Sequence, residues 1–272
     1  MVGRNLHHQF TSPVINVMYR AISAVTVRVL RDFGEVEDLQ TSLKGPGNFV
    51  SITDKQVEAT IRDELQRARP DYGFIGEESG AVAGNDSPYT WVLDPIDGTN
   101  NFVHGYPHFC ISLALVKDGV PIAGMIHDPL RDELFFAYRG EGVYEQRQRL
   151  RVSKRHDFVT ALGATTGPLR GGEQDGMKRF TAAMVHIPCV RQTGSAALDL
   201  AYVAAGRLDV FWSEKLAPWD CLAGILMVQE AGGYATDFKN KKITLATENI
   251  KVLAGNPEIH GKMLDVFKDA LS

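Results

Sequence analysis

A short acidic segment at residues 94–102 has the residue types and spacing of a catalytic or metal site. Asp94 and Asp97 lie three residues apart around a proline, and Gly98, Thr99 and two amides follow. Two carboxylates on one tight turn repel each other and lose hydration unless a cation lies between them. Oxygen ligands of this kind suit Mg²⁺ or Mn²⁺ better than zinc. If Gly98 and Thr99 begin a helix, its free N–H groups add an anion site, and the combination indicates a phosphate ester.

Other carboxylates occur where buried elements are expected to begin or end. Glu77 and Glu78 follow a short apolar strand, Asp220 begins an apolar helix, and Asp54 lies in the first turn of another helix. Each has a simpler explanation when taken alone: Asp54 and Asp220 suit the positive end of a helix dipole, and residues 94–102 could be an aspartate-rich turn. Together, the acids predict a site for more than one metal ion.

The composition describes an ordinary globular protein. The 272 residues include 29 lysines and arginines against 33 aspartates and glutamates, a net charge of −4 that argues against a general nucleic-acid binder. No apolar run approaches the ~20 residues that span a bilayer, and the first ten residues lack the apolar core of a signal peptide. The three widely spaced cysteines suit a reducing compartment. We therefore expect a cytoplasmic protein without membrane contact.

Hydrophobic periodicity predicts the elements that carry the acids in the first part of the chain. One helix should begin at Ser12 and bury a stripe that ends with Val25 and Leu30. A second should begin with a capping box of Thr53 and Gln56. Strands are predicted at residues 73–76, 89–93, 109–117, 120–127 and 133–138.

The pattern changes near residue 150 to alternating strands and helices. Short strands near 186–190 and 208–212 alternate with helices near 195–205, 219–231 and 257–271. We therefore expect two halves. Residues 1–150 form an N-terminal α+β half with most metal ligands, and residues 151–272 form a C-terminal α/β half with Asp220 and the substrate-side residues.

Four segments form an ordered and specific pattern: residues 50–54, 76–79, 94–102 and 219–224. On these segments the chain resembles the inositol monophosphatase family, most closely its bacterial SuhB-like branch, over about residues 12 to 270. The family is part of the Mg²⁺-dependent, lithium-sensitive phosphatase superfamily that includes fructose-1,6-bisphosphatase. The resemblance implies the layered αβαβα sugar-phosphatase fold, a combination of α+β and α/β patterns, and a homodimer.

The resemblance also implies a ligand set for two or three Mg²⁺ ions per site, with Mn²⁺ as a substitute. Glu77, Asp94 and the carbonyl of Ile96 would hold the first ion. Asp94, Asp97 and Asp220 would hold the second, with Asp94 bridging, and Glu77 would hold a weaker third ion with water.

The implied reaction hydrolyses inositol monophosphate, or a related small polyol phosphate, to an alcohol and inorganic phosphate by metal-activated water, without a covalent intermediate. Glu77 would take part in catalysis, and Thr99, hydrogen-bonded to Asp54, would position and help deprotonate the attacking water. Backbone N–H groups of Gly98 and Thr99 would bind the phosphate. The alcohol side would be lined by Asp97, Gly194, Ser195, Ala196 and Asp220.

Two positions depart from the family pattern. Asn100 replaces a second threonine, and Ser213 replaces the glutamate that contacts inositol hydroxyls, while Glu214 should point to the opposite face of its strand. The substrate could therefore be fructose-1,6-bisphosphate, a phosphoadenosine nucleotide or histidinol phosphate. The SuhB-like branch offers a further alternative, a regulatory partner in transcription and ribosomal RNA maturation. The sequence itself does not indicate such nucleic-acid or transcription-complex contact.

Overall fold

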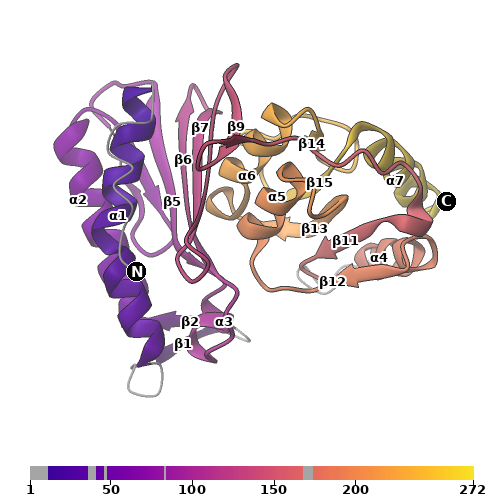
Figure 1. The fold of residues 1–272 in the computed structure, drawn as a ribbon, viewed down its shortest axis with the longest axis horizontal. Coiled ribbons are helices and arrows are strands. Elements are labelled where there is room, and N and C mark those ends of the chain that lie inside the picture. The colour runs from indigo at the N-terminus through magenta and orange to yellow at the C-terminus, as the bar shows by residue number, and fades with distance from the viewer. Residues whose placement is uncertain (1–11, 36–40, 46–47, 83, 168–173) are drawn as a thin grey trace.

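Two mixed sheets and three layers of helices alternate along the long axis of the molecule (Figure 1). The computed structural model describes residues 12–35, 41–45, 48–82, 84–167 and 174–272, with side chains outside residues 41–51. The first ten residues, on which the signal-peptide argument depends, lie outside this range. The layer order helix, sheet, helix, sheet, helix confirms the predicted αβαβα architecture.

Helices α1 (Pro13–Gly34) and α2 (Ile52–Ala68) cover the outer face of the larger sheet (Figure 1). As predicted, α1 begins after Ser12. The expected stripe is wrong at its end, because Val29 is buried while Leu30 is 38% exposed. A step of four residues from Val25 stays on the same helix face, whereas a step of five leaves it.

The predicted capping box of α2 is also wrong. The helix begins at Ile52, so Thr53 already lies in its first turn. The Thr53 hydroxyl donates to Asp32 Oδ2 of α1 at 3.0 Å. A buried threonine therefore joins the two outer helices instead of capping one of them.

The larger sheet has eight strands in the order β10-β9-β8-β7-β6-β5-β3-β4, antiparallel except for the parallel pair β3 and β5. All five strands predicted in this half are present. The strands are β3 (Gly73–Gly76), β4 (Gly80–Val82), β5 (Tyr89–Asp97), β6 (Cys110–Lys117), β7 (Val120–Asp128), β8 (Glu133–Tyr138), β9 (Gly142–Glu145) and β10 (Gln148–Arg149). A separate pair, β1 (Thr41–Gly45) and β2 (Asn48–Ser51), and the short helix α3 (Thr99–Val103) complete this half.

The smaller sheet has five strands in the order β12-β11-β13-β15-β14. Its strands are β11 (Leu162–Thr165), β12 (Cys189–Arg191), β13 (Val210–Leu216), β14 (Tyr234–Thr236) and β15 (Ile250–Gly255). Helices α5 (Ala196–Ala204) and α6 (Pro218–Glu230) lie between the two sheets, and α4 (Gln174–His186) and α7 (Pro257–Asp269) lie on the outer face (Figure 1). A 3₁₀ turn, η2 (Phe158–Thr160), precedes the sheet. The sequence argument missed α4, β11, β14 and β15, of which β11 has four residues and β14 three.

The apolar core between the two sheets crosses the expected boundary at residue 150. This cluster includes Val92 of β5, Phe211 of β13 and most of the buried face of α6. Both expected halves contribute residues to this one cluster. The division of the chain into two halves therefore stays a prediction.

Among the described helices, α1 alone is long and apolar enough to cross a membrane by length and composition. Its apolar residues Ile15, Met18 and Ile22 are buried in a cluster with Leu113 and Met125 of the larger sheet. This face of the helix packs within the protein, and 33% of the apolar window of α1 is buried.

Candidate metal centre

An irregularity in β5 brings Asp94 and Asp97 to the same side of the sheet. In regular β-structure, residues three apart point to opposite faces. Against β6, however, Asp94 pairs with Ser112 and Asp97 pairs with Cys110. Between these two pairs β5 advances by three residues while β6 advances by two. Such a bulge rotates the chain and redirects the next side chain. Pro95 occurs at this point, where β5 makes no regular pairing with β6.

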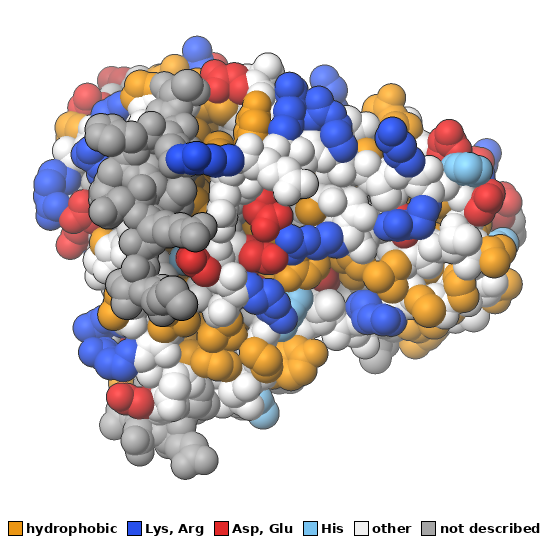
Figure 2. Space-filling model, viewed as in Figure 1, with side chains coloured by type: hydrophobic (Ala, Val, Ile, Leu, Met, Phe, Trp, Pro, Cys, Tyr) orange, Lys and Arg blue, Asp and Glu red, His pale blue; other side chains and the backbone are white. Residues whose placement is uncertain are grey.

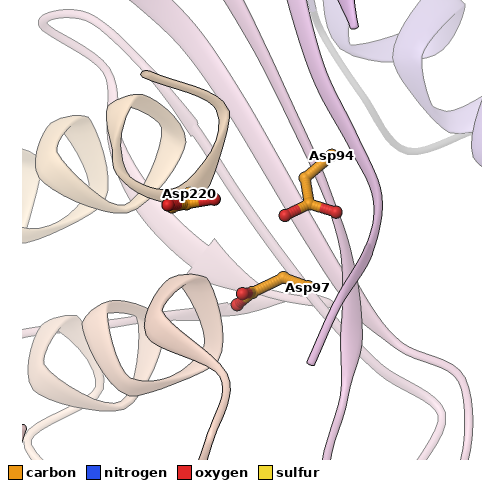
Figure 3. Close-up of side chains that lie close together, drawn as sticks. All are labelled: Asp94, Asp97 and Asp220. Carbon is orange, nitrogen blue, oxygen red and sulfur yellow. The ribbon is translucent and has the colours of Figure 1, made fainter. Parts of the chain in front are cut away.

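Asp220 approaches the same place from the other half of the chain. It lies in the first turn of α6, where its Oδ2 accepts a hydrogen bond from Ala217 N at 2.8 Å. The Ser112 hydroxyl of β6 donates to the carbonyl of Trp219 at 3.1 Å and fixes the start of α6 against the sheet. Carboxylate oxygens of Asp94, Asp97 and Asp220 lie within 4.8 Å of one another, and Figure 3 shows that the side chains converge.

Asp94 lies in an unfavourable electrostatic environment. Burial, followed by the charges of Glu77, Asp97, Asp220 and Asp54, raises the pKa of Asp94 well above its usual range. Its Oδ1 accepts a hydrogen bond from Ile96 N at 3.0 Å, and this single neutral donor does not offset four neighbouring carboxylates. Asp54 and Glu77, both predicted site residues, therefore lie close enough to act on Asp94 electrostatically.

The start of α5 holds Asp97 in place. Its Oδ2 accepts hydrogen bonds from Ser195 Oγ at 2.6 Å and from Ala197 N at 2.7 Å. Helix N-termini favour negative charge, so α5 provides a stable position for this carboxylate. The backbone contact of Ala197 was not foreseen from the sequence, although its neighbours Gly194, Ser195 and Ala196 were.

Helix α3 begins at Thr99 and Gly98 is its cap, so the helix start considered from the sequence is present. Gly98 has φ 103°, and a Cβ there would lie 3.1 Å from the carbonyl oxygen of His108, so both backbone angle and space favour glycine. The Thr99 hydroxyl donates to the carbonyl of Ile96 at 2.9 Å. The expected hydrogen bond between this hydroxyl and Asp54 stays a prediction.

Asn101 joins the two halves beside the aspartates, and the sequence argument missed this role. Its Nδ2 donates to the carbonyls of His108 at 2.6 Å and Thr193 at 2.8 Å. A Cβ on Gly194, which has φ 90°, would lie 2.8 Å from the same nitrogen. Its place inside the 94–102 segment was the available signal, but the distant partner Thr193 could not be read from the sequence.

Ser213 and Glu214 point in different directions, as expected for neighbours on a strand. The Ser213 hydroxyl lies 2.6 Å from that of Thr166. Glu214 accepts two hydrogen bonds from the buried guanidinium of Arg179, at 2.7 and 2.6 Å. This ion pair commits Glu214 to the outer helix α4, so Glu214 does not take over the position of the missing glutamate.

The donor set fits a hard divalent cation. Three carboxylates converge from β5 and α6, and all their ligand atoms are oxygen. Burial and mutual repulsion disfavour three ionised carboxylates in the metal-free protein. A bound cation would compensate their negative charge and so favour the ionised forms. Mg²⁺ commonly binds through carboxylates and retained waters, which agrees with this set.

Comparison with known proteins agrees with the geometry. The model of the inositol monophosphatase family matches residues 11–272. An inositol-1-monophosphatase of Mesorhizobium japonicum is 45% identical over 263 residues, covering 96% of this chain and 98% of its own. The Nus factor SuhB of Escherichia coli K12 is 38% identical over 268 residues, covering 96% and 97%.

Structural comparison gives the same result. The crystal structure of the extragenic suppressor protein SuhB from Bartonella henselae superimposes with a TM-score of 0.90 at 43% identity. The match covers 94% of this chain and 99% of that protein. The chain therefore belongs to the inositol monophosphatase family of phosphatases.

Proposed function

We propose that this chain is a Mg²⁺-dependent phosphomonoesterase that hydrolyses inositol monophosphate or a related small polyol phosphate. The observation that carries the proposal is the convergence of Asp94, Asp97 and Asp220 within 4.8 Å. Asp54 and Glu77 lie within electrostatic reach of Asp94. An acidic cluster of this kind attracts a phosphate ester only when cations are bound, which explains a metal requirement.

The ligands divide into two groups that share Asp94. Glu77, Asp94 and the carbonyl of Ile96 would hold one Mg²⁺, and Asp94, Asp97 and Asp220 a second, with Glu77 also serving a weaker third. When bound, these ions would lower the pKa of a water and stabilise the charge that develops on the leaving oxygen. The hydrogen bonds from Ser195 and Ala197 to Asp97 Oδ2 hold this carboxylate in the place where it would bind a cation.

Protein groups would supply the remaining chemistry. The Thr99 hydroxyl would orient the attacking water, and the carboxylate of Asp54, at 2% exposure, would accept its proton. Backbone N–H groups of Gly98 and Thr99 would bind the phosphate, which needs no side chain at residue 98. The alcohol would lie against Gly194, Ser195 and Ala196 at the start of α5.

The preferred alcohol is the open part of the proposal. Ser213 supplies a hydroxyl in place of a carboxylate, and this hydroxyl is hydrogen-bonded to the hydroxyl of Thr166. Losing one polar contact to a substrate hydroxyl changes affinity by about 1–3 kcal/mol. Fructose-1,6-bisphosphate, a phosphoadenosine nucleotide and histidinol phosphate are therefore the rival substrates.

Phosphate release from a panel of these esters tests the proposal. We expect hydrolysis of inositol-1-phosphate with Mg²⁺, inhibition by lithium, and loss of activity in Asp94→Asn or with excess chelator. Release that continues unchanged in Asp94→Asn would refute the metal-dependent mechanism. A faster rate on one of the rival esters would keep the mechanism and change the substrate.

A second, regulatory role is favoured by the relatives named Nus factor SuhB, one of which is 38% identical. We propose a homodimer in the cytoplasm, with contact to a transcription complex as the alternative function. The three cysteines are unpaired, which fits a reducing compartment.

Figure 2 shows basic side chains interspersed with acidic and apolar ones on the viewed face, without one continuous basic stripe. Co-purification of transcription factors that persists in Asp94→Asn would support this role, and no partner at physiological salt would count against it.

A further inference from the structure

A buried carboxylate on α2 has no part in the proposed reaction. Glu58 is 2% exposed, and it follows Asp54 by four residues, which places both acids on one face of the helix. Its two oxygens accept hydrogen bonds from the backbone N–H groups of Glu78 and Ser79, each at 2.8 Å. Glu58 therefore holds a turn of main chain.

This turn is the one that presents Glu77 to the aspartates. Glu77 N donates to the carbonyl of Leu93 at 3.2 Å and continues the parallel pairing of β3 with β5. The next two N–H groups, of Glu78 and Ser79, are both bound by Glu58. The backbone is thus fixed on both sides of Glu77, by the sheet before it and by Glu58 after it.

Gly76 shows how closely Glu58 approaches this turn. A Cβ on Gly76 would lie 2.5 Å from Cδ of Glu58 and closer still to Oε2. A side chain at residue 76 would therefore displace the carboxylate. Because the φ angle of Gly76 is outside the left-handed range, it is the contact with Glu58 that demands glycine.

We propose that Glu58 is a positioning residue for the metal centre. It connects α2, which carries Asp54, to the turn that carries Glu77, and so sets the affinity for Mg²⁺. Both its oxygens face backbone N–H groups, so Glu58 supports a ligand without being one. This inference rests on the proposed function, because it takes Glu77 as a metal ligand.

Two substitutions disturb the contact independently. Glu58→Gln keeps the size of the side chain but turns an NH₂ group toward one of the two N–H donors. Gly76→Ala pushes the carboxylate away from the turn. Two substitutions away from the site serve as controls. Glu64→Gln alters an ion pair with Arg67 on the exposed side of α2, and Gly261→Ala adds a methyl group in open space.

The direct readout is Mn²⁺ binding to metal-free protein, measured by electron paramagnetic resonance, with the melting temperature in chelator measured beside it. Loss of a group that orients a metal ligand typically weakens metal affinity by about 10–100-fold. We expect a loss of this size in Glu58→Gln and Gly76→Ala, and a raised Mg²⁺ activation constant with a smaller change in kcat at saturating Mg²⁺. Glu64→Gln and Gly261→Ala should bind Mn²⁺ as the unaltered protein does.

Other outcomes would overturn the inference in distinguishable ways. Unaltered Mn²⁺ affinity in both folded variants, with a normal affinity in the unaltered protein, would remove the role of Glu58 and leave the proposed function intact. Failure of both variants to fold would assign Glu58 to the stability of the N-terminal half. If the unaltered protein itself bound no Mn²⁺, the proposed function would fail first.

Discussion

Replacing Asp94 by asparagine should stabilise the metal-free protein while abolishing its response to Mg²⁺. Two unit charges 4.8 Å apart repel by roughly 3.5 kcal/mol at an effective dielectric constant of about 20. Asp94 belongs to two of the three carboxylate pairs, so its charge accounts for roughly 7 kcal/mol of repulsion at full ionisation. Proton uptake relieves part of this repulsion, because the pKa of Asp94 is raised. We therefore expect a gain of about 1–3 kcal/mol in chelator.

The same substitution removes the shared metal ligand. A ligand present at a hundred times its dissociation constant stabilises a protein by about 2.7 kcal/mol, which the unaltered chain should gain from Mg²⁺. Asp94→Asn should gain almost none of it. Asparagine Oδ1 can still accept the hydrogen bond from Ile96 N, so the turn itself is preserved. Melting curves with chelator and with Mg²⁺ measure both effects, and a change of 1–3 kcal/mol corresponds to roughly 2–10 °C.

Asp128 provides a control, because its substitution by asparagine should change the stability in the opposite direction. It is also fully buried, but it accepts hydrogen bonds from Leu130 N at 3.0 Å and Arg131 N at 3.1 Å, and it pairs with the Arg131 guanidinium at 2.7 Å. Asp128→Asn should therefore destabilise the protein by about 1–3 kcal/mol with or without Mg²⁺. If Asp94→Asn destabilised the metal-free protein as much as Asp128→Asn does, the reasoning from uncompensated charge would be refuted.

Three further substitutions test the surroundings of the site. Ser195→Ala removes the 2.6 Å bond to Asp97 and should weaken Mn²⁺ affinity by about tenfold, as titration of the metal-free protein would detect; an unchanged affinity would contradict this role. Gly194→Ala combines a φ of 90° with a clash against Asn101, so chemical denaturation should show a loss of about 2–3 kcal/mol, and a loss below 0.5 kcal/mol would argue against the clash. Burial lowers the pKa of His127 to about 4. As the pH falls below about 6.5, the unfolded state alone takes up this proton, so the free energy of unfolding should fall by about 2 kcal/mol between pH 7 and pH 5. The stability of His127→Leu should lack this part of the pH dependence.

Local features of the fold were predictable because short stretches of sequence determine them. The strand at 133–138 follows from a short apolar run, and the hairpin turn at Asp118 and Gly119 follows from turn chemistry, since both residues of the turn have positive φ. The errors occurred where tertiary contacts compete with local preference. Thr53 has the sequence signature of a cap, but a buried partner on α1 takes its hydroxyl. The strands β11 and β14 are too short for periodicity to reveal them, and packing against β13 and β15 stabilises them.

The sequence by itself predicted the chemistry of the site: the acids expected in it, their oxygen-only ligand character, and the glycine and hydroxyl that follow Asp97. These properties belong to residue types and close spacing, which the chain fixes covalently. Tertiary structure alone decided that Asp97 turns to the side of Asp94, because this depends on the pairing of β5 with β6. It also decided that Asp220 reaches them from α6 and that Glu58 supports the turn after Glu77. Such contacts join segments far apart in the chain, and only the packing of helices against the sheet brings their side chains within reach.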